Sequence, residues 1–200
     1  NFGEDLLACV RDGSIYYWDA SAGLGTRSVE LSSLSGSVAA PTVARQVLIS
    51  DRDRHAIAFG CNPENSSVQD PMLIRFSDQE NLYDWAATAT NTAGDLKMGS
   101  GSGFIQAVET RQQILVFTDT SLYSMQFIGP PLTFGITLIS ENVQIQGPNA
   151  AIAVDDSVYW MGGDNLYIFN GITNIIPCTV RDYVFDDFNS SRNKKAAAWL

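Results

Sequence analysis

Short apolar runs alternate with turn-forming residues along the chain, and the clearest example lies between residues 114 and 129. Residues 114–117 are continuously apolar, as a buried strand requires. Asp119 then supplies turn chemistry, because an Asp side chain can hydrogen-bond its own backbone two residues further on. Residues 122–127 alternate between apolar and polar positions. One face of that strand would carry Tyr123, Met125 and Phe127. The stretch therefore predicts a β-hairpin.

The same pattern recurs elsewhere in the chain. Each copy has an Asp, small polar residues, a branched aliphatic residue, a Tyr and an alternating strand, and the further copies begin at Asp12, Asp156 and Asp164. The strands that open each unit are expected 50, 48 and 47 residues apart, near Leu6, Ala56, Phe104 and Ala151. A period of about 40–50 residues with several strands per period is typical of β-propeller blades. A β-sandwich is the alternative, but its turn signals come every ~8–12 residues without a longer period.

We therefore expect an all-β, propeller-like module of about four repeated antiparallel blades that forms part of a larger propeller. The blades are expected at residues 6–50, 56–100, 104–146 and 151–178, with 179–200 as the start of a next unit. The strand at 43–50 would close the first blade. Residues 86–103 are expected to form a long polar loop, and a short helix is expected within 179–188. The Asn at position 1 and the apolar last residues suggest a segment of a longer chain.

Charge and cysteine content narrow the classes of function. The chain has 22 acidic and 12 basic residues and a net charge of −10, which disfavours tight binding of nucleic-acid phosphates. Any face turned toward DNA is therefore expected to be neutral or acidic. The sequence shows no apolar run near the ~20 residues of a membrane span and no basic-then-apolar leader. Three widely separated cysteines argue against a disulfide framework and against zinc, and they are interpreted as small buried thiols: Cys9, Cys61 and Cys178.

The candidates for catalysis are few. His55 is the only histidine, and a Ser-His-Asp or Cys-His centre would need it as the base. Because it follows the charged run 51–54, it is expected in an exposed turn. The acids Asp78, Glu80 and Asp84 could in principle form a glycosidase pair. They lie on one local segment, however, and are better explained as a solvated loop anchored by a buried Trp85.

Other candidate sites have simpler structural explanations. The glycine-rich run 99–103 lacks the Lys-Ser/Thr of a phosphate-binding loop and is expected to be a flexible connector. Four residues could supply oxygen ligands to calcium, but their positions are explained by turn formation: Asp155, Asp156, Asp164 and Asn165. Two short glycosylation-like patterns begin at Asn65 and Asn189. Strand aromatics could bind sugar, but their regular positions favour core packing: Tyr16, Tyr17, Trp18, Tyr123, Tyr159, Trp160 and Tyr167. We predict no catalytic, cofactor-binding or metal-binding residues.

Seven short stretches, spread over most of the chain, share one resemblance: 74–80, 84–85, 90–96, 114–123, 134–136, 158–162 and 181–187. Together they resemble the virion tail proteins of tailed bacteriophages, the group that includes the β-propeller nozzle, or tail tubular, subunits of short-tailed phages. The chain departs from that pattern at Phe76, where the family has Trp, and at Leu82, where it has Pro.

The resemblance implies a non-enzymatic structural component of a phage tail, located in the virion, that assembles with copies of itself around the DNA conduit for genome delivery. It implies an adaptor ring, other nozzle domains or fibres as neighbours, DNA that passes without specific binding, and no cofactor. The alternative is a host-surface propeller that binds carbohydrate or cleaves glycans. Aromatic and acidic residues clustered on one exposed rim would favour that alternative, whereas burial between blades would favour a structural role.

Overall fold

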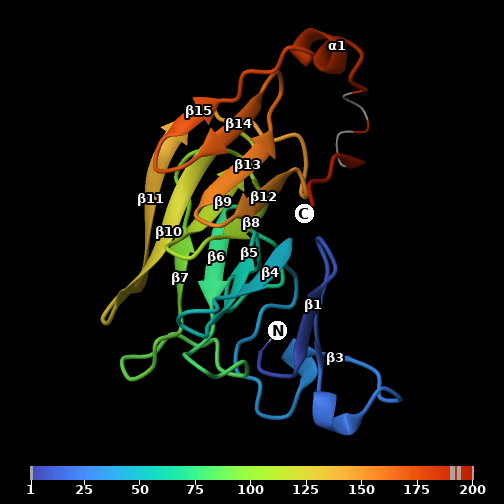
Figure 1. Cartoon of the computed structure of the whole chain (residues 1–200). Helices are drawn as coiled ribbons and strands as arrows, with labels where there is room; N and C mark the ends of the chain where they lie inside the picture. The colour runs from blue at the N-terminus through green and yellow to red at the C-terminus, as the bar shows by residue number, and fades with distance from the viewer. Residues whose placement is uncertain (1, 190–191, 193–194, 200) are drawn as a thin grey trace. The chain divides into compact units, whose positions relative to one another are not determined.

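A computed structural model describes residues 2–189, 192 and 195–199 of the chain (Figure 1). Its strands form four antiparallel sheets in which consecutive strands are hydrogen-bonded neighbours. The first sheet contains β1 (Leu6–Cys9), β2 (Ile15–Trp18) and β3 (Val29–Glu30). The second contains β4 (Gln46–Ile49), β5 (Ala56–Phe59), β6 (Leu73–Phe76) and β7 (Gly94–Lys97).

The second half of the chain repeats this organisation. The third sheet contains β8 (Phe104–Glu109), β9 (Ile114–Thr118), β10 (Ser121–Gly129) and β11 (Thr133–Glu141). The fourth contains β12 (Ala151–Val154), β13 (Ser157–Met161), β14 (Leu166–Phe169) and β15 (Thr173–Ile175). The helices named within residues 2–189 are short: two 3₁₀ turns at Ala20–Ala22 and Leu31–Ser33, and α1 at Arg181–Asp186. No helix in the described ranges is long and apolar enough to span a membrane.

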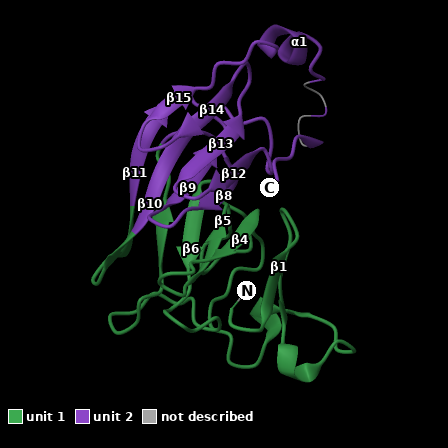
Figure 2. Cartoon of the chain, in the orientation of Figure 1, with its two compact units in different colours: residues 1–99, 127–135 green, residues 100–126, 136–200 purple. Residues whose placement is uncertain are grey.

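The chain divides into two compact units, coloured separately in Figure 2. Unit 1 comprises Asn1–Gly99 and Phe127–Gly135, and it includes the first two sheets together with the end of the β10–β11 hairpin. Apolar residues from both sheets form its core, and the central strands β5 and β6 of the second sheet are buried on both faces. Ile15 of β2, Ala58 of β5 and Leu73 of β6 are buried there beside Trp85.

Unit 2 comprises Ser100–Gln126 and Ile136–Leu200, and its core lies between the third and fourth sheets. Phe117 of β9 meets Trp160 of β13 edge to face, with ring centroids 5.2 Å apart. The Gln106 side-chain amide donates to the Ala151 carbonyl at 2.9 Å, and its oxygen accepts from the Ala151 N–H at 3.0 Å. Two sheets thus pack face to face through aromatic rings and one satisfied polar pair.

The expected all-β class and its antiparallel hairpins are confirmed. Opening strands lie where predicted at Leu6, Phe104 and Ala151, but the second sheet opens at β4 and not at Ala56. β4 therefore does not close the first blade, because it pairs with β5 across the charged turn 51–55. The expected loop 86–103 contains β7, which pairs with β6 at the edge of the sheet. The helix expected within 179–188 is present as α1, although none of its residues is buried.

Candidate functional site

His55 is fully buried, so its expected location in an exposed turn is wrong. Three rings surround it in unit 1, with centroids at 6.3 Å for Phe76, 5.9 Å for Phe127 and 5.2 Å for Phe134. Neither ring nitrogen has a hydrogen-bond partner. Burial lowers the pKa of His55 to about 4, although the Asp78 carboxylate opposes this effect. His55 is therefore a neutral ring in an aromatic cluster and has no hydrogen-bonded nucleophile beside it.

Two of the three acids at 78–84 hold their own loop together. Asp78 accepts hydrogen bonds from the Thr92 N–H at 2.8 Å and the Thr92 hydroxyl at 2.6 Å. Burial raises the pKa of Asp78, but hydrogen bonds from Thr92 and Gln79 outweigh burial, and the pKa is lowered overall. Asp84 accepts from the Asn91 side chain at 3.1 Å. Glu80 forms a solvent-exposed ion pair with Arg54, 3.5 Å away.

Arg75 and Trp85 fix the same segment from inside unit 1. The Arg75 guanidinium is buried and donates to three carbonyls, those of Ala39 at 2.7 Å, Trp85 at 3.0 Å and Asn62 at 3.4 Å. The Trp85 indole N–H donates to the Leu82 carbonyl at 2.8 Å. Trp85 is 1% exposed, which confirms the expected anchoring role. Arg75 thus cross-links backbone segments from distant parts of unit 1.

The glycine-rich loop is a hydrogen-bonded structure, so its interpretation as a flexible connector is wrong for the part in unit 2, residues 100–103. Asp119 accepts from the Ser102 N–H at 2.7 Å, the Ser102 hydroxyl at 2.6 Å and the Gly103 N–H at 3.4 Å. Gly101 has a φ of +103°, and a Cβ there would collide with the Asp119 and Thr118 side chains. The glycine is therefore required by the close approach of the β9–β10 turn.

Replacing Asp119 by Ala is expected to lower the free energy of unfolding of unit 2 by roughly 1–2 kcal/mol, because backbone and hydroxyl donors lose a charged acceptor. Urea denaturation followed by circular dichroism measures the change. Asp156→Ala is the matched control, since Asp156 is an exposed turn residue. Equal stability of the two variants would mean that the Asp119 hydrogen bonds contribute nothing measurable.

The remaining polar candidates are turn and surface residues. No cluster of three or more potential metal-ligating His, Cys, Asp or Glu side chains occurs among the residues that the structure describes. Asp164 accepts from the Tyr167 hydroxyl at 3.1 Å, and Asp155 lies 3.6 Å from Arg111 in an exposed ion pair. Asn65 is exposed in a turn, whereas the pattern at Asn189 extends into residues 190–191, which lie outside the described residues.

The thiols are unpaired, and only one is fully buried. Cys61 is buried in the core of unit 1, and burial raises its pKa to about 12. Burial also raises the pKa of the partly exposed Cys9 to about 11. Cys178 is partly exposed. Because the thiolate is the reactive form, the raised pKa values make Cys9 and Cys61 poor nucleophiles.

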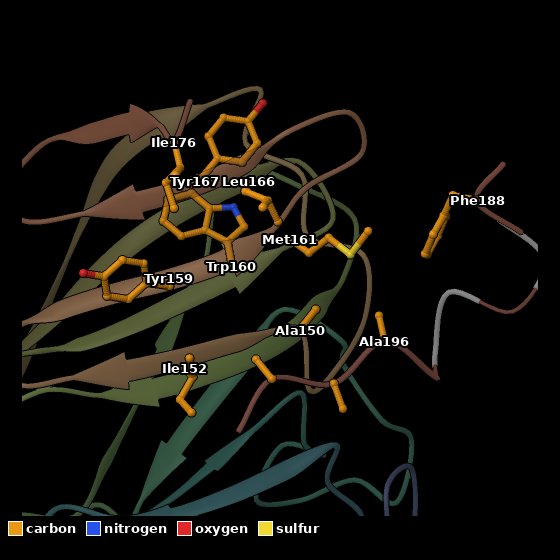
Figure 3. Close-up of a pocket in the computed structure, with 12 residues that line it drawn as sticks. Ala150, Ile152, Tyr159, Trp160, Met161, Leu166, Tyr167, Ile176, Phe188 and Ala196 are labelled. Atoms are coloured by element: carbon orange, nitrogen blue, oxygen red, sulfur yellow. The ribbon is translucent and has the colours of Figure 1, made fainter. Parts of the chain in front are cut away.

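The strand aromatics do not share one environment. Trp160 and Tyr123 are buried, but Tyr159 is 37% exposed. Tyr159 belongs to an apolar groove of about 480 Å³ in unit 2, which also includes Ile152, Met161 and Leu166. Figure 3 shows these side chains on β12–β14, with Phe188 and Ala196 from the last segment of the chain on the other side.

The sequence analysis named Tyr159, Trp160 and Tyr167 as strand aromatics but did not predict this groove. Its residues come from β12–β14, from positions 150 and 176 just outside strands, and from the chain after α1. The sequence did contain a signal for the groove, because β12, β13 and β14 each have a second apolar face. On that face, Tyr159 pairs with Ile152 and with Ile168. A single sheet buried on one side only would place polar residues at those positions.

Comparison with known proteins adds no family assignment: the chain matches no protein-family model and no curated protein. Function must therefore be inferred from its residues.

Proposed function

We propose that this chain is a non-enzymatic structural component of a bacteriophage tail, in the nozzle or tail tube. Copies of a β-propeller-like module would assemble around the DNA conduit, next to adaptor or fibre proteins. This proposal rests on the structural role of the stretches 74–80 and 84–85, which resemble phage tail proteins. Arg75 and Trp85 are buried and bonded to backbone carbonyls, and Asp78 is bonded to Thr92, so the most distinctive residues build a scaffold.

The charge of the chain supports a role beside moving DNA. A tail conduit has to let DNA pass, and a basic lining would gain affinity with each phosphate that it neutralises. The excess of 22 acidic over 12 basic residues leaves few cations to form such a lining. Acidic side chains repel phosphates at short range, since screening limits their effect to ~8 Å at physiological salt.

The purified chain is therefore expected to show no tight, salt-sensitive binding to double-stranded DNA. Fluorescence anisotropy with a labelled duplex, titrated at low and at physiological salt, measures this. A basic DNA-binding domain of similar size serves as the positive control. Tight binding that weakens steeply with added salt would contradict the proposed neutral or acidic lining.

The carbohydrate-binding alternative is favoured by one observation, the partly exposed Tyr159 beside the groove. Aromatic rings stack on sugars, but a sugar site also needs polar groups for the hydroxyls, and the groove is lined mainly by aliphatic and Ala side chains. A glycan array with Tyr159→Ala as the comparison separates the two functions. Glycan binding that is lost in Tyr159→Ala would favour the host-surface function.

Antibody labelling tests the proposed location. Antibodies raised against the purified chain are applied to virions of the phage that encodes it, and immunogold electron microscopy records the position of the label. Label at the tail supports the proposal. Absence of the chain from purified virions, with the protein found only in the infected cell, would overturn it.

A further inference from the structure

The hairpins β9–β10 and β13–β14 are equivalent residue by residue. Phe117 pairs with Leu122 in the first hairpin, and Met161 pairs with Leu166 in the second. A Tyr follows each of the two Leu residues. In both hairpins a two-residue turn joins the strands, at 119–120 in the first and at 163–164 in the second. Leu115 and Tyr159 each lie two residues before Phe117 and Met161, respectively. The same three positions therefore lie on the same face of both sheets.

These equivalent faces differ in what covers them. In the third sheet, Leu115, Phe117 and Leu122 are completely buried in the core that is shared with the fourth sheet. In the fourth sheet, the β13–β14 face, defined here as Tyr159, Met161 and Leu166, lines the open groove, and Tyr159 is 37% exposed. The face of the third sheet is thus covered by a further antiparallel sheet, the fourth, which contributes Trp160 to the contact.

The first sheet carries the Trp of this covering pattern, but the exposed Glu30, which pairs with Tyr16, stands at the position equivalent to the buried Phe169. Trp160 pairs with Ala151 on the first strand of its sheet, and Trp18 pairs with Leu6 on the first strand of the first sheet. Trp18 is therefore the register equivalent of Trp160, and Tyr16 is the equivalent of Val158. We name Leu6, Tyr16 and Trp18 the β1–β2 face; it lies opposite Leu7, Cys9 and Tyr17, which pack against the core of unit 1.

Within unit 1, no described sheet covers the β1–β2 face. Leu6 is 43% exposed, and Tyr16 and Trp18 are partly exposed. None of the three belongs to the core of unit 1. One chain thus carries a face equivalent in register to each side of the Phe117–Trp160 contact of unit 2.

We propose that the β13–β14 face of one copy binds the β1–β2 face of a second copy. The contact would repeat the packing between the third and fourth sheets, with Met161 in the place of Phe117 and Trp18 in the place of Trp160. Because the two faces are different surfaces, the association is head to tail, and such contacts form rings when the rotation between copies closes. This inference rests on the proposed function in one respect, since it names the surfaces by which the tail component would self-assemble.

Sedimentation velocity across a micromolar concentration series tests the contact. The unaltered chain is expected to form dimers or larger species. Tyr159→Asp is expected to weaken association roughly tenfold or more, because a charge would be buried at an apolar contact. Tyr183→Asp is the matched control, since Tyr183 is 85% exposed on α1 and lies outside both faces. Circular dichroism checks that each variant is folded, and Leu166→Asp replaces Tyr159→Asp if the latter unfolds.

Cross-linking identifies the faces that meet. One sample carries Met161→Cys, another carries Trp18→Cys, and both have Cys9→Ser and Cys178→Ser. A short bis-maleimide is expected to link the two variants only when they are mixed. The proposal would be overturned by a monomer at all concentrations or by association that Tyr159→Asp leaves unchanged. It would also be overturned if a chain that carries both Met161→Cys and Trp18→Cys formed a link within itself while the mixed single variants formed none. These outcomes do not depend on the labelling of virions, so either inference can fail without the other.

Discussion

Trp160→Ala is expected to lower the free energy of unfolding of unit 2 by roughly 3–5 kcal/mol, the usual effect of truncating a buried aromatic side chain. Trp160 is 2% exposed. It meets Phe117 edge to face, and it stacks on Tyr167 with ring centroids 5.3 Å apart and an interplanar angle of 12°. Truncation would remove both ring contacts and leave a cavity between the third and fourth sheets. Urea denaturation followed by far-ultraviolet circular dichroism measures the loss.

Two further variants separate ring packing from other effects. Trp199→Ala is the matched control, because Trp199 is 82% exposed, and it is expected to leave stability almost unchanged. Trp160→Phe is expected to cost much less than Trp160→Ala, since the buried indole N–H has no hydrogen-bond partner to lose. If Trp160→Ala were as stable as Trp199→Ala, Trp160 would not be part of a packed core.

Acidification is expected to destabilise unit 1 by up to about 3 kcal/mol as the pH falls from 6.5 to 4, since each unit of pKa difference corresponds to ~1.4 kcal/mol. The folded-state pKa of His55 is lowered to about 4 by burial, from an ordinary value of 6.5. The unfolded chain therefore binds the proton first, so the contribution of neutral His55 is complete above pH 6.5 and is lost as the pH falls toward 4. Hydrogen exchange of the β5 and β6 amides at a series of pH values measures this loss.

His55→Phe provides the comparison for the pH effect. It keeps an aromatic ring beside Phe76 and Phe134 but cannot bind a proton. Between pH 6.5 and 4, it is expected to lose much less stability than the unaltered chain. Asp78 and Asp119 have lowered pKa values, so most of their contribution to stability is lost below pH 4, whereas burial raises the pKa of Asp53. The same pH dependence in His55→Phe and in the unaltered chain would contradict the assignment to His55.

Local patterns determined how much of the fold could be predicted. The β9–β10 and β13–β14 hairpins were predictable because alternation and turn residues are properties of neighbouring positions. β4 was placed in the wrong sheet, because an apolar run does not show which neighbour it pairs with. β7 was missed because Gly94 and Asp95 are poor strand formers, and pairing with β6 overrides that preference.

Candidate sites were harder to predict, because burial depends on distant residues. His55 follows four charged residues, yet Phe127 and Phe134 cover it from more than 70 positions further along the chain. The groove at Tyr159 required knowledge of which sheet face remains uncovered. By contrast, the anchoring role of Trp85 was predictable, since a Trp at the end of a polar loop usually packs inward.

A cryo-electron microscopy reconstruction of the intact virion tests the structural role most directly. The proposed function predicts that density fitting both two-sheet units of this chain occurs in several copies around the DNA conduit of the tail, with a neutral or acidic surface facing the DNA. Density for the chain at a host-binding tip away from the conduit, or a strongly positive lumen at its position, would contradict that role.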